Sequence, residues 1–182
     1  FALRTACVEL TLRQAPAGLA LDTLEQERCG PSYTVETLQA YRQREPDNEF
    51  FFLMGAVDLP TLPSWKQGLE LPQWTSLVAV PRETAELDTV TAFIASHWPE
   101  AQRRDASPQN KQTAQAVWEF AQGTQLIYLP LPRMEVSSTM VRRYWRQGRS
   151  LIGLVPEGAL AALEQERDLV DDIWGQETYQ DG

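Results

Sequence analysis

The longest apolar run of the sequence, residues 50–57, is the feature that most constrains the fold. Its first five residues, from Phe50 to Met54, are continuously apolar, and the run then meets Gly55. A short run that stops at a glycine is typical of a strand buried on both faces in a parallel sheet. It is much shorter than the roughly 20 residues needed to cross a bilayer, so it predicts no transmembrane helix.

Other stretches predict strands and helices that alternate along the chain. The further strands are expected at residues 19–24, 77–80 and 126–129, and the helices at residues 3–10, 34–44, 88–98, from 137 onward and 156–167. Residues 59–65 are too rich in proline for a long helix, and residues 113–121 fit either a helix or a strand. The alternation predicts an α/β fold with a parallel sheet, whose ligands bind at the carboxyl ends of the strands.

The length of 182 residues, 43% of them hydrophobic, suits one compact domain. We expect this domain to cover residues 1–167, with a variable insertion at residues 99–123 and an acidic tail at residues 168–182. The chain opens at Phe1 without a methionine, in a pattern typical of the back half of an amphipathic helix. This opening predicts further residues upstream.

Charge and reactive residues exclude several classes of protein. The formal net charge of −9 repels polyanions, which argues against nucleic-acid binding, although a local pocket of amides and arginines can still hold a small anion. Cys7 and Cys29 have neither metal-ligand spacing nor the density of a disulfide scaffold, so we expect a cytoplasmic protein. The one histidine, His97, excludes any site in this chain that needs a histidine pair.

The strongest candidate site is a helix start at Ser137, Ser138 and Thr139, with Arg142 in the next turn. Free amides, hydroxyls and a guanidinium in one turn can bind phosphate oxygens. The plainer interpretation is an N-cap followed by a solvated arginine, and the spacing alone somewhat favours it.

Two weaker candidates lie earlier in the chain. The helix start after Gly30-Pro31 could hold a carboxylate on the amide of Thr34, or it could be a plain cap. Trp65, on a loop beside a strand end, could stack on a flat ring, but large aromatics more often cover a core.

In their order along the chain, these segments resemble the bacterial nicotinate-nucleotide adenylyltransferase family, a branch of the nucleotidyltransferase superfamily with a Rossmann-like fold. The matching segments are Ser32–Leu38 (family S-Y-T-x-x-T-L), Phe52–Ala56 (a strand ending in G-x-D), Leu62–Trp65 (L-P-x-W), Arg82, and Val136–Arg142 (I-S-S-T-x-I-R). The resemblance extends from about residue 4 to residue 167.

The resemblance implies adenylyl transfer from ATP, with Mg²⁺, to nicotinate mononucleotide. The implied ATP-binding residues are Gly55, Ser137, Ser138, Thr139 and Arg142, and the implied nicotinate-nucleotide residues are Tyr33, Thr34, Trp65, Lys66 and Arg82. The amides of Thr34 and Lys66 would receive the nicotinate carboxylate, and Trp65 would stack on the pyridine ring. The expected partners are these two nucleotides, with no nucleic acid and no membrane. A homo-oligomer stays open.

The chain departs from the family in two places. Val57 stands where the family's G-x-D motif has its aspartate, and Asp58 would lie on the other side of an extended backbone. The glycine-rich first loop and the H-x-G-H motif do not occur in the chain. We therefore assign no catalytic residue here, and we expect these motifs in a missing upstream unit of at least roughly 30 residues. Two alternatives stay open: a non-catalytic nucleotide-binding relative, and an adenylyltransferase that uses nicotinamide mononucleotide.

Overall fold

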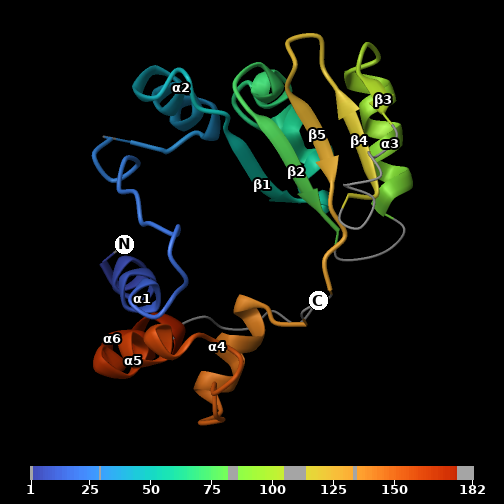
Figure 1. Cartoon of the computed structure of the whole chain (residues 1–182). Coiled ribbons are helices and arrows are strands. Elements are labelled where there is room, and N and C mark those ends of the chain that lie inside the picture. The colour runs from blue at the N-terminus through green and yellow to red at the C-terminus, as the bar shows by residue number, and fades with distance from the viewer. Residues whose placement is uncertain (1, 29, 82–85, 105–113, 133–134, 176–182) are drawn as a thin grey trace. The chain divides into compact units, whose positions relative to one another are not determined.

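The computed structural model describes residues 2–28, 30–81, 86–104, 114–132 and 135–175 (Figure 1). These residues form two compact units. The helical unit consists of residues 2–23 and 135–175, and the sheet unit consists of residues 24–132. Each unit has its own hydrophobic cluster.

The sheet unit contains a five-stranded mixed sheet with the order β1-β2-β5-β4-β3 (Figure 1). The strands are β1 (Phe51–Gly55), β2 (Ser76–Val80), β3 (Gln102–Arg104), β4 (Ala116–Glu119) and β5 (Gln125–Tyr128). β1, β2 and β5 are parallel, which confirms the expected α/β fold, whereas β4 and β3 extend the sheet in antiparallel fashion. β3 falls in the stretch expected to be a variable insertion, where polar residues without alternation gave no strand signal, and its residues are exposed in the structure.

Apolar side chains from strands and helices meet in one core in this unit. Strands β2 and β5 alternate strictly, so that Leu77 and Leu126 are fully buried while their neighbours are less so. Helix α3 (Glu86–His97) packs Val90 and Ile94 against them. The core also receives residues from helix α2 (Thr34–Arg44) and from two 3₁₀ helices, η1 (Ala56–Ser64) and η2 (Gly68–Gln73).

Strand β1 is not buried on both faces, contrary to the expectation from its apolar sequence. Phe51 and Leu53 are 55% and 64% exposed, whereas Met54 is buried and Phe52 packs against the core. β1 lies at the edge of the described sheet, and alternate side chains of a strand point to opposite faces. A continuously apolar run therefore predicted the strand but not its burial.

The strand expected at residues 19–24 does not form. These residues are irregular, Leu19 is 64% exposed, and a turn begins at Leu24. A strand needs a hydrogen-bonded neighbour, and none of the described strands pairs with this segment.

The helical unit contains α1 (Ala2–Leu12), α4 (Ser138–Arg146), α5 (Glu157–Gln165) and α6 (Arg167–Gly175). α1 confirms the helix predicted at the start of the chain and packs closely on α5, since a Cβ on Gly158 would stand 2.4 Å from the Leu10 carbonyl oxygen. α6 lies where an acidic tail was expected, and its Val170 is fully buried. The prediction of a tail rested on the acidic residues and overlooked two apolar residues at helical spacing, Val170 and Trp174. Both belong to the hydrophobic cluster of the helical unit.

None of the helices in the described ranges is both long enough and apolar enough to span a bilayer.

Candidate functional site

The start of helix α2 leaves backbone amides for a ligand. Its N-cap, Tyr33, has extended backbone angles (φ −109°, ψ 132°), and no side chain caps the helix. The amides of Glu36 and Thr37 donate to the Tyr33 carbonyl oxygen at 3.0 and 3.2 Å. The amides of Thr34 and Val35 come earlier in the first turn, where the helix itself supplies no acceptor.

The loop that carries Trp65 is fixed by several hydrogen bonds. The Trp65 indole Nε1 donates to Thr61 Oγ1 at 3.0 Å, and its backbone amide donates to the Leu62 carbonyl oxygen at 3.0 Å. A Cβ on Gly68 would stand 2.1 Å from that same carbonyl oxygen, so only glycine fits there. Trp65 packs against the core yet is only half-buried, so its ring covers the core and keeps surface for another contact.

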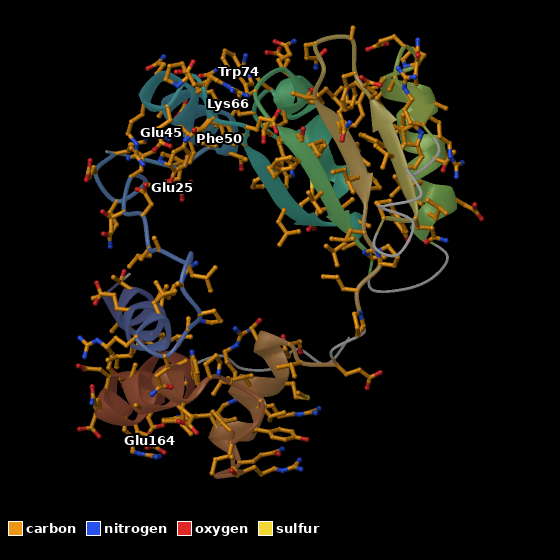
Figure 2. The ribbon with its side chains drawn as sticks, viewed as in Figure 1. Glu25, Glu45, Phe50, Lys66, Trp74 and Glu164 are labelled. Atoms are coloured by element: carbon orange, nitrogen blue, oxygen red, sulfur yellow. The ribbon has the colours of Figure 1, made fainter. Side chains whose placement is uncertain are left out.

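The Lys66 side chain joins this loop to the start of α2 (Figure 2). Its Nζ forms a hydrogen-bonded ion pair with Glu36 in the first turn of the helix. It also lies 4.4 Å from the centroid of the Tyr33 ring, a cation–π distance. The hydrogen bond to Glu36 raises the pKa of Lys66 above its ordinary value. The structure thus brings together Tyr33, Lys66 and the turn that contains Thr34.

A carboxylate that the sequence analysis did not assign lies at the carboxyl end of β1. The backbone after Gly55 forms η1 rather than an extended segment, which corrects the expected placement of Asp58. Asp58 folds back, so that its Oδ2 lies 2.9 Å from where a Cβ on Gly55 would stand. Gly55 has ordinary backbone angles (φ −67°, ψ 139°), so its role is to leave room for the Asp58 carboxylate in this position, and a larger residue would displace that side chain.

The start of helix α4 differs from that of α2 in its cap. Ser137 is the N-cap, in agreement with the plainer interpretation of this helix start, and its Oγ accepts a hydrogen bond from the Met140 amide at 3.2 Å. Ser138 and Thr139 are exposed in the first turn. Arg142 follows Ser138 by four residues and Thr139 by three, so the three side chains lie on the same face of the helix. The first turn of α4 contains no acidic residue.

The predicted site residues divide between the two units. Tyr33, Thr34, Gly55, Trp65 and Lys66 belong to the sheet unit, whereas the predicted phosphate-binding residues from Ser137 to Arg142 belong to the helical unit. Arg82 lies outside the described residues.

The remaining reactive side chains have local structural contacts. The His97 ring stacks on Phe93 at 4.3 Å, and its Nδ1 lies 3.1 Å from the Phe93 carbonyl oxygen. The Cys7 thiol donates to the Ala159 carbonyl oxygen at 3.9 Å, and burial raises its pKa. Within the described ranges, no three or more acidic, histidine or cysteine side chains gather as a metal site would require.

A cavity of about 410 Å³ opens at the amino ends of β1, β2 and β5. The Arg42 guanidinium in its wall donates to the carbonyl oxygens of Asn48 and Trp74 and lies over the Phe50 ring. The Thr124 hydroxyl donates to a backbone carbonyl oxygen. These polar groups serve the fold, and the cavity lies at the opposite ends of the strands from Gly55.

Comparisons with known proteins give one consistent result. No protein-family model matches the chain. It is 29% identical over 161 residues to a probable nicotinate-nucleotide adenylyltransferase of Maridesulfovibrio salexigens, covering 88% of this chain and 70% of that protein. It is 30% identical over 164 residues to a protein of the same description from Methylococcus capsulatus (90% and 73%), and 30% identical over 168 residues to one from Geobacter metallireducens (92% and 74%).

Solved structures agree on the fold. The nicotinic acid mononucleotide adenylyltransferase of Plasmodium falciparum, complexed with NaAD, matches with a TM-score of 0.64 at 12% identity, over 94% of this chain and 74% of that one. The same enzyme complexed with APC matches with a TM-score of 0.61, over 94% and 76%.

Proposed function

The chain belongs to the nicotinate-nucleotide adenylyltransferase family, and on that premise we propose that it transfers the adenylyl group of ATP to nicotinate mononucleotide. A phosphate oxygen of the mononucleotide attacks the α-phosphorus of ATP in line, and the bond between the α-phosphorus and its bridging oxygen to the β-phosphorus breaks. The products are nicotinate adenine dinucleotide and pyrophosphate, so the reaction is a step in NAD biosynthesis. The observation that carries the proposal is 30% identity over nine tenths of the chain.

The start of α2 and the loop at Trp65 suit the nicotinate half of the acceptor. The amides of Thr34 and Lys66 can donate to its carboxylate, and the positive end of the helix dipole favours a carboxylate over a neutral carboxamide. The Trp65 ring, held by Thr61, can stack on the pyridine. These features support nicotinate over nicotinamide as the base.

The start of α4 suits the phosphates of ATP. Its first-turn amides, the hydroxyls of Ser138 and Thr139 and the Arg142 guanidinium are all donors, and they oppose the negative charge of the chain locally. Mg²⁺ enters with ATP as the ion on its phosphates. Little covalent work falls to the protein in such a transfer, so these groups act by positioning and by charge.

Asp58 supports the proposal, because it supplies a carboxylate near the position where Val57 replaces the family's aspartate. Its carboxylate lies against Gly55 at the carboxyl end of a parallel strand, where ligands of such sheets bind. A carboxylate there can accept hydrogen bonds from the ribose hydroxyls of ATP. We assign this contact with the ribose to Asp58.

The test is an assay of the protein as its source encodes it. Mg-ATP is supplied with either nicotinate or nicotinamide mononucleotide, and both pyrophosphate and dinucleotide are measured. Turnover that prefers the nicotinate substrate is the expected result. Preference for the nicotinamide substrate contradicts the assigned acceptor. Calorimetric binding of both nucleotides without pyrophosphate release identifies the non-catalytic alternative.

A further inference from the structure

We propose that the Lys66 side chain is a specificity-determining positioning residue, which neutralises Glu36 so that the start of α2 accepts a carboxylate. The inference rests on the proposed function, because it concerns the same nicotinate-binding segment. It adds a role for the ammonium group of Lys66, which is distinct from the backbone amide of that residue.

The first step is the position of Glu36. It stands two residues after Thr34, in the first turn of α2. A carboxylate there is stabilised by the helix dipole, but it also places a negative charge beside amides that would bind another carboxylate. Unpaired, Glu36 would repel nicotinate mononucleotide and leave nicotinamide mononucleotide, with its neutral carboxamide, nearly unaffected.

The second step is the pairing of that charge. Lys66 Nζ binds the Glu36 carboxylate directly, and the Tyr33 ring, 4.4 Å away, holds the ammonium from another side. The hydrogen bond to Glu36 also raises the Lys66 pKa, so the pairing further favours the charged form of an amine that is already protonated at neutral pH. The two charges cancel locally, and the dipole and amides of the turn are left to select the ligand.

The third step separates this role from simple support of the fold. Both side chains of the pair are substantially exposed, 45% for Lys66 and 37% for Glu36, so removing the ammonium creates no cavity. A displaced loop would carry the Lys66 amide away from the nicotinate carboxylate whether or not Glu36 is charged. Loss of charge neutralisation weakens binding of the nicotinate form alone, and only while Glu36 keeps its charge.

The experiment measures calorimetric dissociation constants of the two mononucleotides for wild type and variants, with turnover of the wild type followed in parallel. Lys66→Met is expected to raise the dissociation constant of nicotinate mononucleotide about three- to ten-fold and to change that of nicotinamide mononucleotide less than two-fold. Lys66→Arg retains wild-type selectivity, and Glu36→Gln added to Lys66→Met restores it, because the unpaired charge is gone.

The matched control is the other end of the same helix. Arg44 Nε lies 3.5 Å from Glu45 Oε1, and its Cζ lies 5.1 Å from the centroid of the Tyr41 ring. Arg44 therefore has the same two kinds of contact as Lys66, an ion pair with a glutamate and a cation–π contact with a tyrosine, but far from Thr34. Arg44→Met is expected to leave both dissociation constants unchanged.

Three outcomes overturn the inference: an equal change for both nucleotides in Lys66→Met, no rescue by Glu36→Gln, or an equal effect of Arg44→Met. Absence of wild-type turnover contradicts the proposed function alone, because the selectivity is read from binding. Absence of binding of either nucleotide to the wild type contradicts both.

Discussion

Helices α2 and α4 begin in different ways, and the difference agrees with the anion that we propose for each. α4 is capped by the Ser137 hydroxyl, has no acidic residue in its first turn and carries Arg142 one turn later. α2 has no side-chain cap, and its one acidic first-turn residue, Glu36, is paired with Lys66. Both starts offer the same amides and the same dipole. The side chains around the start of α4 suit a multiply charged phosphate, and those around the start of α2 suit a single carboxylate.

This comparison explains how an acidic chain can bind two nucleotides. The net charge of −9 opposes both ligands at long range, but salt screens exposed charges beyond about 8–10 Å. Within that distance, the groups in the first turn of each helix determine whether an anion binds there. At α4 the added charge is positive, whereas at α2 the added charges cancel, so selection there depends on hydrogen bonds more than on net charge.

The largest expected effect comes from removing the charge that distinguishes α4. Arg142→Ala is expected to lower kcat/KM for ATP about 100-fold or more, because a guanidinium on the reacting phosphates stabilises the charge of the transition state. The KM for nicotinate mononucleotide should change little. Steady-state kinetics with each substrate varied in turn measures both. The neighbouring exposed Arg143→Ala is the control, and an equal loss there would contradict a specific role for Arg142.

A smaller effect is expected on the α2 side from Trp65→Ala. Loss of the stacking ring should raise KM for nicotinate mononucleotide about 30-fold, since base stacking on an aromatic ring contributes about 1–3 kcal/mol. KM for ATP should stay within about two-fold, the reverse of the Arg142 pattern. Trp65→Phe keeps a ring but loses the hydrogen bond to Thr61, so its KM for nicotinate mononucleotide should lie between those of the wild type and Trp65→Ala. A parallel rise in both KM values would show that the two helix starts do not act separately.

The two helix starts were predictable from sequence because the signals that begin a helix are local. Ser137 satisfies an amide three residues away, and Thr34 follows an extended residue, so neither depends on distant parts of the chain. The parallel strands were predictable for a similar reason, from short apolar runs that end at turn residues. The order of the strands in the sheet was not predictable. The exposure of Phe51 was missed for that reason, because it depends on which strands flank β1.

The residues that sequence reasoning missed depend on tertiary contacts or on turn type. The pair of Lys66 and Glu36 joins residues 30 apart, and only the local signal of an acidic first turn pointed to Glu36. Asp58 was misplaced because the segment after Gly55 was treated as extended, although the prolines at 60 and 63 fix φ for a tight helix there.

The amide at the start of α2 can be removed without removing the helix. Thr34→Pro deletes the N–H at the first helical position, where proline is well tolerated, and the extended Tyr33 already suits a residue before proline. The preference for nicotinate over nicotinamide mononucleotide should fall about ten-fold, because a hydrogen bond to a charged group is lost. Competition between the two substrates measures this ratio. Thr34→Ala, which keeps the amide, should retain the preference, and a fall there would assign the effect to the hydroxyl.

The smallest expected effect tests the difference in capping itself. Ser137→Ala removes the acceptor of the Met140 amide and should destabilise the first turn of α4 by about 1 kcal/mol, so hydrogen exchange at Met140 should become about five-fold faster. Ser32→Ala, beside the uncapped start of α2, should leave exchange in the first turn of that helix unchanged, since no side chain caps it. Unchanged exchange at Met140 would show that the Ser137 hydroxyl contributes nothing to the cap. The two helix starts would then differ in their charges alone, and the preference of α4 for phosphate would rest on Arg142.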